Sequence, residues 1–218
     1  MLHLVDKQIE MQWQGVRFVL KKPTPNSAVS HLDLLLADRV VRDCIQVHAA
    51  GIRCWRIHRR FGDSSPNGGD HIFSFYLYSS RDTFTQIRQH IEQSAIAKSL
   101  VETGQLLRVI FEEEDTDPLR SRSLFGFTSA SEWSQEVQES WPYFAMGLSQ
   151  ELLAMIQSCR TKLGESSELS MPDSISNYAA IENRIDEIWF NEGQAFVLHQ
   201  SSAMFGYSPT LITMPLQF

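Results

Sequence analysis

The stretches IRCWRIHRRF (residues 52–61) and HIFSFYLYS (residues 71–79) decide the fold. Both are rich in β-branched and aromatic residues, which favour strands. They are separated by GDSSPNGGD (residues 62–70), a run of turn-forming residues. The sequence therefore predicts a long β-hairpin with an extended loop. Side chains alternate between the two faces of a strand, so Arg56, His58 and Arg60 are expected on one face and Arg59 on the other.

Two further strands and two helices are predicted around this hairpin. Residues 12–20 (QWQGVRFVL) and 105–112 (QLLRVIFE) have the composition of strands. Apolar residues at helical spacing predict one helix from residue 26 or 27 to Gly51 and another from Ser80 to Gly104. The order β-α-β-β-α-β is that of a split βαβ, ferredoxin-like sheet with both helices on one face.

The C-terminal part has a different pattern, and the helical signal dominates it. Helices are predicted at residues 131–163, with Ser131 as the N-cap, and at residues 177–191. Pro142 is expected to kink or restart the first of them, since proline lacks an amide donor. Residues 194–199 are predicted to add an edge strand. The fold class is thus α+β, a ferredoxin-like portion at residues 1–118 and a helical portion at 119–218 packed on it, together forming one compact domain.

Charge, hydropathy and cysteines narrow the classes of function. The net charge is −7, with a balance of +4 in residues 1–110 and −11 in residues 111–218. An acidic chain is not expected to bind nucleic acid. No apolar run reaches the roughly 18 residues of a membrane span, and Asp6, Lys7 and Glu10 stand where a signal peptide would be apolar. Three cysteines are too few to stabilise the fold of a chain of this size by disulfide bonds. A cytoplasmic protein with reduced thiols, outside membranes, is expected.

Metal chemistry is not expected from the sequence. Cys44, His48, Cys54 and His58 form C-x3-H-x5-C-x3-H, and thiolates and imidazoles are zinc ligands. However, Cys54 and His58 lie on a predicted strand, where four residues span about 13 Å, too far for one metal ion. The acidic run at residues 112–117 lacks the glycine and spacing of a calcium loop. Neither pattern predicts a metal, and no cofactor is expected.

A cationic platform is the candidate binding surface. Arg56, His58 and Arg60 share one strand face, and Tyr76 lies on the neighbouring strand. Because the predicted helices cover only the other face of the sheet, this group is expected to be an exposed anion-binding surface. The alternative is a solvated outer sheet face paired with the acidic second half of the chain.

The predicted helix after residue 131 carries more large aromatic residues than one sheet face requires. Tyr143 separates two interpretations of this helix. Either these side chains are core, or Pro142 bends the helix so that Tyr143 lines a groove for a partner or for a second copy of the chain. Both interpretations bury Trp141.

Residues 55–77, WRIHRRFGDSSPNGGDHIFSFYL, resemble the C-terminal domain of lantibiotic dehydratases and thiopeptide-type bacteriocin biosynthesis proteins. That family's hairpin reads aromatic-Ile-Arg-Tyr-x-Asp, a loop, then His-Leu-Arg-Leu-Arg. Residues 60–63 (RFGD) match its first half and His71 its second, while Phe73 and Phe75 occupy the two arginine positions and Phe61 that of the tyrosine. The helix with LLLADR (residues 34–39) also looks like the family's opening, and the likeness covers residues 12–160.

The resemblance implies a protein that matures a peptide natural product. It implies elimination of glutamate from glutamylated Ser or Thr side chains, or formation of a pyridine ring by cycloaddition, with aminoacyl-tRNA as the sole nucleic-acid partner. His71 and Arg60 are then the candidate catalytic residues, and Arg56 and Arg59 are candidates to hold a carboxylate or phosphate. His58, Tyr76 and Tyr143 complete the candidate substrate-binding set. The alternative is a non-catalytic module that binds a precursor peptide or partner protein, or that forms a homodimer.

Overall fold

The computed structural model describes residues 10–22, 29–59, 70–113, 133–163 and 170–204. Its centre is a four-stranded antiparallel sheet in the order β2-β3-β1-β4. The strands are β1 (Met11–Leu20), β2 (Ile52–Arg59), β3 (His71–Ser80) and β4 (Leu106–Glu113). All four lie within about two residues of the predicted ranges. The mixed α and β composition and the mainly helical C-terminal part are also confirmed.

The predicted hairpin pairs β2 with β3. Trp55 lies opposite Leu77 and Arg59 opposite Phe73, so alternate side chains of both strands point to the same face. That face carries the fully buried side chains Phe73, Phe75 and Leu77. The strand β1 lies between β3 and β4 and adds Val16, Phe18 and Leu20 to the same core.

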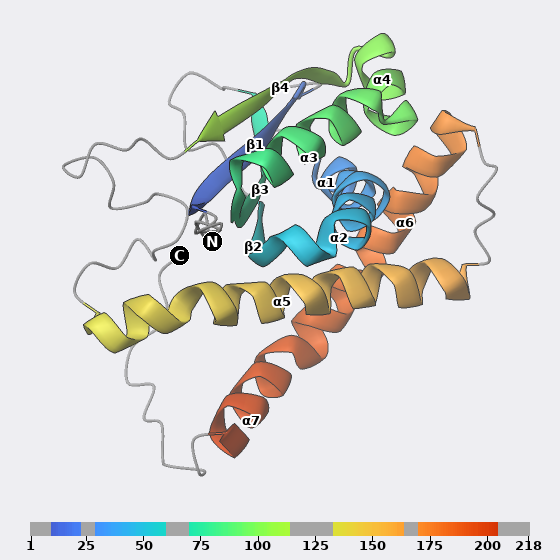
Figure 1. The fold of residues 1–218 in the computed structure, drawn as a ribbon. Coiled ribbons are helices and arrows are strands. Elements are labelled where there is room, and N and C mark those ends of the chain that lie inside the picture. Colours follow the sequence, from blue (N-terminus) through green and yellow to red (C-terminus); the bar gives the residue numbers. More distant parts are fainter. Residues whose placement is uncertain (1–9, 23–28, 60–69, 114–132, 164–169, 205–218) are drawn as a thin grey trace, which may run out of the picture.

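The helices of the N-terminal part cover this apolar face (Figure 1). The first segment is α1 (Ser30–Leu36), a π-helical turn η1 (Ala37–Val41), α2 (Arg42–His48) and a 3-10 turn η2 (Ala49–Gly51). The second is α3 (Arg81–Gln93) and α4 (Ala95–Glu102). Ser80 caps α3 as predicted, because its hydroxyl accepts the Thr83 amide at 3.1 Å. Ser94 interrupts the expected single helix and caps α4. Gly104, at φ +71°, follows it in a conformation that favours glycine.

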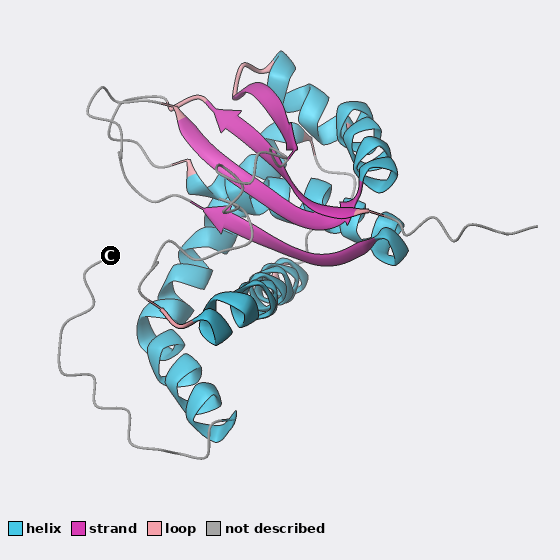
Figure 2. Ribbon diagram, turned by 60° about the vertical axis from the view of Figure 1, so that its left-hand side comes forward, coloured by secondary structure: helices cyan, strands magenta, loops and turns pink. Residues whose placement is uncertain are grey.

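The C-terminal helices pack beside the sheet and against α1 (Figure 2). They are α5 (Gln135–Lys162), α6 (Met171–Ile188), the π-helical turn η3 (Trp189–Gly193) and α7 (Gln194–Met204). α5 runs along the free edge of β2, and α6 contacts α1 and α5. Leu153, Ile156, Tyr178 and Ile181 belong to the same hydrophobic cluster as the sheet. None of the described helices is both long and apolar enough to cross a membrane.

Two predictions about this part are wrong. Residues 194–199 form helix α7 and not an edge strand, and α7 projects away from the sheet (Figure 1). Helix α5 continues through Pro142, so of the two predicted effects of this proline the restart is absent. Trp141 was predicted to be buried but is only half-buried, because its ring neighbours Trp133, which precedes α5, and Phe144 are themselves exposed. The predicted N-cap Ser131 lies outside the described residues, and Ser134 caps α5.

Candidate functional site

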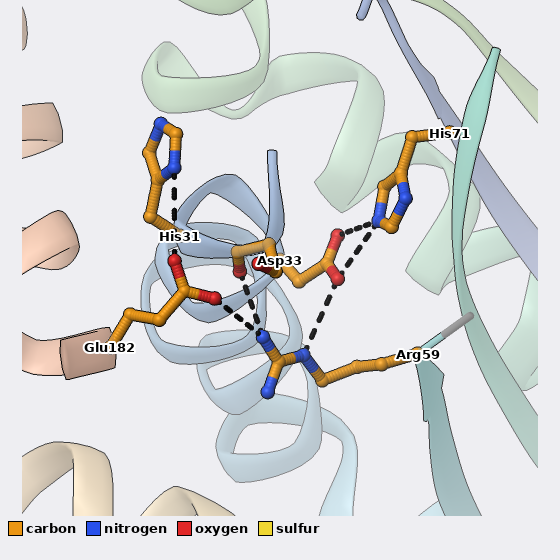
Figure 3. Close-up of polar contacts among 6 residues, drawn as sticks. His31, Asp33, Arg59, His71 and Glu182 are labelled. Carbon is orange, nitrogen blue, oxygen red and sulfur yellow. Dashed lines mark hydrogen bonds and ion pairs between the residues drawn. The ribbon is translucent and has the colours of Figure 1, made fainter. Parts of the chain in front are cut away.

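Three elements that are distant in the sequence deliver charged side chains to one point beneath the sheet. Asp33 lies in the first turn of α1, Arg59 is the last residue of β2, and His71 is the first residue of β3. Arg59 and His71 have the parity of Phe73 in the β2–β3 register, so both point to the helix-covered face. Their side chains therefore meet Asp33 where the hairpin strands end (Figure 3).

His71 and Arg59 share the carboxylate of Asp33. Nε2 of His71 lies 2.8 Å from Oδ1 and 2.9 Å from Oδ2 of Asp33, and Nε of Arg59 lies 3.3 Å from Oδ2. The Asp33 side chain is completely buried, whereas those of His71 and Arg59 are 9% and 13% exposed. A carboxylate only accepts hydrogen bonds, so Nε2 of His71 carries the proton.

The second nitrogen of His71 is the candidate proton acceptor of this group. With Nε2–H donated to Asp33, Nδ1 is the basic nitrogen of the neutral ring. Nδ1 has no hydrogen-bond partner among the described residues. An acid that holds one imidazole nitrogen fixes the tautomer and stabilises the imidazolium formed when the other takes a proton. The pair Asp33–His71 can therefore accept and return a proton.

Helix α6 completes the cluster through Glu182. Oε1 of Glu182 lies 3.2 Å from Nη2 of Arg59, and Oε2 lies 3.9 Å from Nδ1 of His31 (Figure 3). The carbonyl of Ser30 accepts a further Arg59 hydrogen bond at 3.1 Å. Burial lowers the pKa of His31, and the nearby carboxylates of Glu182 and Asp33 offset part of that effect. We call Asp33, Arg59, His71 and Glu182 the acid–imidazole cluster.

A second buried acid holds α5 and α6 in the position that this cluster requires. Asp38 accepts from Nε of Arg42 at 2.7 Å, from Nη1 of Arg160 at 2.8 Å and from the Tyr178 hydroxyl at 2.6 Å. Arg160 lies on α5, and Tyr178 lies on α6 one turn before Glu182. Asp38 thus fixes the helix that supplies Glu182.

The predicted site residues do not form one site. Only His71 and Arg59 belong to the acid–imidazole cluster, while Arg56, His58 and Tyr76 lie on the opposite face of the sheet. Arg60 lies outside the described residues. Tyr143 lies on α5 with 56% of its surface exposed, so it is not a core residue.

The side chains of the predicted cationic platform contact one another, but they do not form an exposed surface. Cζ of Arg56 lies 4.6 Å from the centroid of the Tyr76 ring, and Nη1 of Arg56 lies 3.5 Å from Nδ1 of His58. Arg56 and Tyr76 are only 7% and 5% exposed. Burial lowers the pKa of the Arg56 guanidinium, against the opposing influence of Tyr76 and Cys54. The expectation of an open anion-binding surface here is wrong, because the guanidinium packs on the tyrosine ring.

Sequence reasoning missed Asp33, Glu182 and His31. A signal for Asp33 was present, because HLDLLLAD (residues 31–38) places two acids in a helix whose other residues are mostly apolar. An acid on a buried helix face requires a partner, and such a partner is often functional. No comparable signal marks Glu182, which stands among several acids of α6.

Comparison with protein-family models, with curated proteins and with solved structures found no match to this chain. The function proposed below therefore rests on the geometry of the acid–imidazole cluster and on the resemblance of the hairpin.

Proposed function

We propose that this protein is a peptide-tailoring enzyme that acts on a precursor peptide, with His71 transferring the proton. The observation that supports this proposal is the contact between His71 Nε2 and both oxygens of the buried Asp33 carboxylate. A histidine oriented in this way, whose other nitrogen has no partner in the part of the chain that the structure describes, is suited to general acid–base catalysis.

The reaction proposed is elimination from a glutamylated Ser or Thr side chain. Nδ1 of His71 takes the proton from the α-carbon of that residue. The electron pair of the C–H bond forms the Cα–Cβ double bond, the Cβ–O bond breaks, and glutamate leaves as a carboxylate. The proton on His71 returns to solvent, and no oxidant or cofactor is required. Asp33 stabilises the imidazolium between these steps.

The fold supports the proposed relation to the C-terminal domain of lantibiotic dehydratases. The strand order β2-β3-β1-β4 with antiparallel pairing throughout is compatible with a ferredoxin-like split βαβ sheet, which we infer for residues 11–113. The three cysteines are buried and unpaired, which supports a reducing compartment and hence the proposed cytoplasmic location.

Arg59 is no longer a candidate to hold a carboxylate or phosphate of the substrate. Its guanidinium is engaged by Asp33, Glu182 and the Ser30 carbonyl, so we assign it as a positioning residue for Asp33 and not as a substrate ligand. Arg60, the next residue, lies outside the described residues, and its catalytic role stays a prediction of the hairpin resemblance.

Mass spectrometry of a glutamylated precursor peptide tests the proposal. We expect the protein to convert the peptide to its dehydrated form, and the His71→Ala variant to be slower by about 100-fold or more. His90→Ala is the matched control, because His90 is a partly exposed histidine of α3 paired with Asp43 outside the cluster. A peptide that wild-type protein leaves unchanged, or equal rates for the two variants, would contradict the proposal.

A non-catalytic interaction module is the second candidate function. It is favoured by a row of exposed apolar side chains on α5, where Tyr143, Phe144 and Leu148 are 56%, 45% and 40% exposed. In this case Tyr143→Ala weakens peptide binding or self-association and leaves the melting temperature unchanged. Sedimentation of wild type and variant, with and without the precursor peptide, distinguishes this function from the enzymatic one.

A further inference from the structure

Strand β4 is the outermost strand of the sheet on the side away from α5 (Figure 1). It pairs with β1 on one side, and no described residue pairs with it on the other. An edge strand presents a row of backbone N–H and C=O groups that can pair with another chain. The pairing of β4 with β1 shifts once, between Val19 and Leu20, and is regular from Arg108 to Glu113. This regular stretch is therefore a template for a further strand.

The side chains of this stretch alternate between the two faces of the sheet. Val109 and Phe111 pack against the hydrophobic core. By alternation, Arg108, Ile110 and Glu112 point to the opposite face. Arg108 is exposed, and it has no hydrogen-bond or ion-pair partner in the part of the chain that the structure describes. The three apolar side chains are only half-buried, so the open edge leaves apolar surface in contact with water.

The sequence RVIFE (residues 108–112) is self-complementary in the antiparallel direction. Two edge strands related by a twofold axis perpendicular to the sheet pair antiparallel, and both copies use the same patch. When Ile110 lies opposite Ile110 of the second copy, Arg108 of each copy lies opposite Glu112 of the other. Val109 then lies opposite Phe111. Opposite charges and apolar pairs placed directly across two strands stabilise their pairing.

Other registers do not give this match. A centre between two residues would bring together side chains of opposite faces. A pair centred on Val109 or Phe111 places a charged side chain opposite Ile110. A pair centred on Arg108 or on Glu112 places two like charges opposite each other, which is destabilising. Charges on an edge strand commonly keep chains apart, but here two opposite charges equidistant from Ile110 attract a second copy.

We propose that two copies of this chain associate through β4, antiparallel about Ile110, and so join their sheets into one continuous sheet. In this dimer the carboxylate of Glu112 lies between two guanidinium groups. One is that of Arg17 in its own chain, with Nη2 2.8 Å from Oε2 of Glu112, and the other is that of Arg108 in the second copy. The interface is separate from the exposed apolar side chains of α5, and the inference goes beyond the proposed function.

Sedimentation equilibrium of the full chain, at concentrations up to about 100 μM, tests the proposal. We expect a reversible dimer for the wild type. Arg108→Glu should raise its dissociation constant about tenfold or more, because the symmetry turns two attractive pairs into two repulsive ones. The matched control is Arg53→Glu, the same charge change at an exposed position of β2, the strand at the opposite end of the sheet.

The control should change the dissociation constant by less than about twofold, because its charge is far from the interface. Three outcomes would overturn the proposal. They are a wild type that stays monomeric, an equal effect of the two variants, and a dimer that is lost in Tyr143→Ala but kept in Arg108→Glu.

A cysteine cross-link tests the register of the pairing. Directly opposite residues of antiparallel strands have Cβ atoms about 5 Å apart, so Ile110→Cys brings two thiols within reach of a disulfide. Diamide should convert this variant to a cross-linked dimer on a non-reducing gel, and the three native cysteines are buried. Arg108→Cys is the control, because its thiol faces Glu112 of the second copy. No cross-link in Ile110→Cys, or equal cross-linking of both variants, would contradict pairing about Ile110.

Discussion

Asp33 and Asp38 lie on one helical segment and both are buried, but their hydrogen-bond partners differ. Asp38 has three partners, Arg42, Arg160 and Tyr178, which satisfy its oxygens from three helical elements. Asp33 has an arginine and a histidine as partners, and an imidazole is a side chain that commonly serves in acid–base catalysis. The same residue type is therefore structural at position 38 and suited to chemistry at position 33.

Replacement of Asp33 by Asn should be strongly destabilising. The change leaves Arg59 largely buried with Glu182 as its remaining acidic partner among the described residues, and a buried ion pair that loses one member costs about 3 kcal/mol. Urea unfolding measures the free energy of unfolding. The control Asp43→Asn alters an acid that is 56% exposed, and should change that free energy by less than about 1 kcal/mol. Equal losses would show that Asp33 is not a structural anchor.

Acid should destabilise the protein through His31. Its pKa in the folded state is lowered below 6.5 by burial, so below that pH the unfolded state binds more protons than the folded state. The stabilising contribution of neutral His31 is complete above about pH 7 and is lost as the pH falls through the window below 6.5.

Thermal melts at a series of pH values check this expectation. The melting temperature should fall below pH 6.5, and it should fall less in His31→Gln, which has no group to titrate. The pKa of His48 is lowered in the same direction, so part of the decline should persist in that variant. An identical pH profile for wild type and variant would remove His31 from the explanation.

At the scale of elements, helix α5 covers the β2 edge of the sheet. On the β2 edge, the Ser149 hydroxyl of α5 accepts the Ile57 amide at 3.0 Å and donates to the Ala145 carbonyl at 2.7 Å. The Cys54 thiol reaches the Pro142 carbonyl at 3.5 Å on the same side. A helix therefore takes the place of a fifth strand there, which protects the edge from pairing with another chain.

Ser149→Ala tests this cap. The substitution leaves the Ile57 amide without its acceptor in a half-buried position, and we expect a loss of about 1–2 kcal/mol in the free energy of unfolding. Ser140→Ala is the control, because Ser140 is exposed and its hydroxyl donates to the Val137 carbonyl of its own helix. Hydrogen exchange should also accelerate at Ile57 in the first variant. Protection equal to wild type would mean that α5 does not cap the edge.

The sequence predicted elements well where one periodicity dominates, and less well where tertiary contacts decide. The four strands are marked by their β-branched and aromatic residues, and the hairpin partners follow from their adjacency. Residues 194–199 contain the apolar run AFVL, which suggests a strand, but helix propagation from α6 through η3 continues into α7. The acid–imidazole cluster was only half predictable. His71 and Arg59 stand in the hairpin, whereas Glu182 comes from a helix more than a hundred residues later.

At the scale of the molecule, the uneven charge of the chain is partly neutralised across its two halves. Arg59 in the basic half pairs with Glu182 in the acidic half. Arg160 of the acidic half pairs in turn with Asp38 of the basic half. The first pair joins α6 to strand β2, and the second joins α5 to the π-helical turn η1. The basic and acidic halves of the chain are therefore joined by these specific ion pairs.

These contacts predict that the helical part and the sheet unfold together. Trp55 reports on the sheet core, while α5 and α6 contribute a large part of the far-ultraviolet circular dichroism, and both regions share one hydrophobic cluster. Urea transitions followed by Trp55 fluorescence, with the other four tryptophans replaced by Phe, and by dichroism should coincide. Tyr178→Phe removes the hydroxyl that donates to Asp38. It should lower both urea midpoints equally, corresponding to a loss of about 1–2 kcal/mol in the free energy of unfolding. Two separate transitions, or a shift confined to the dichroism, would show that α5 and α6 unfold independently of the sheet that they cover.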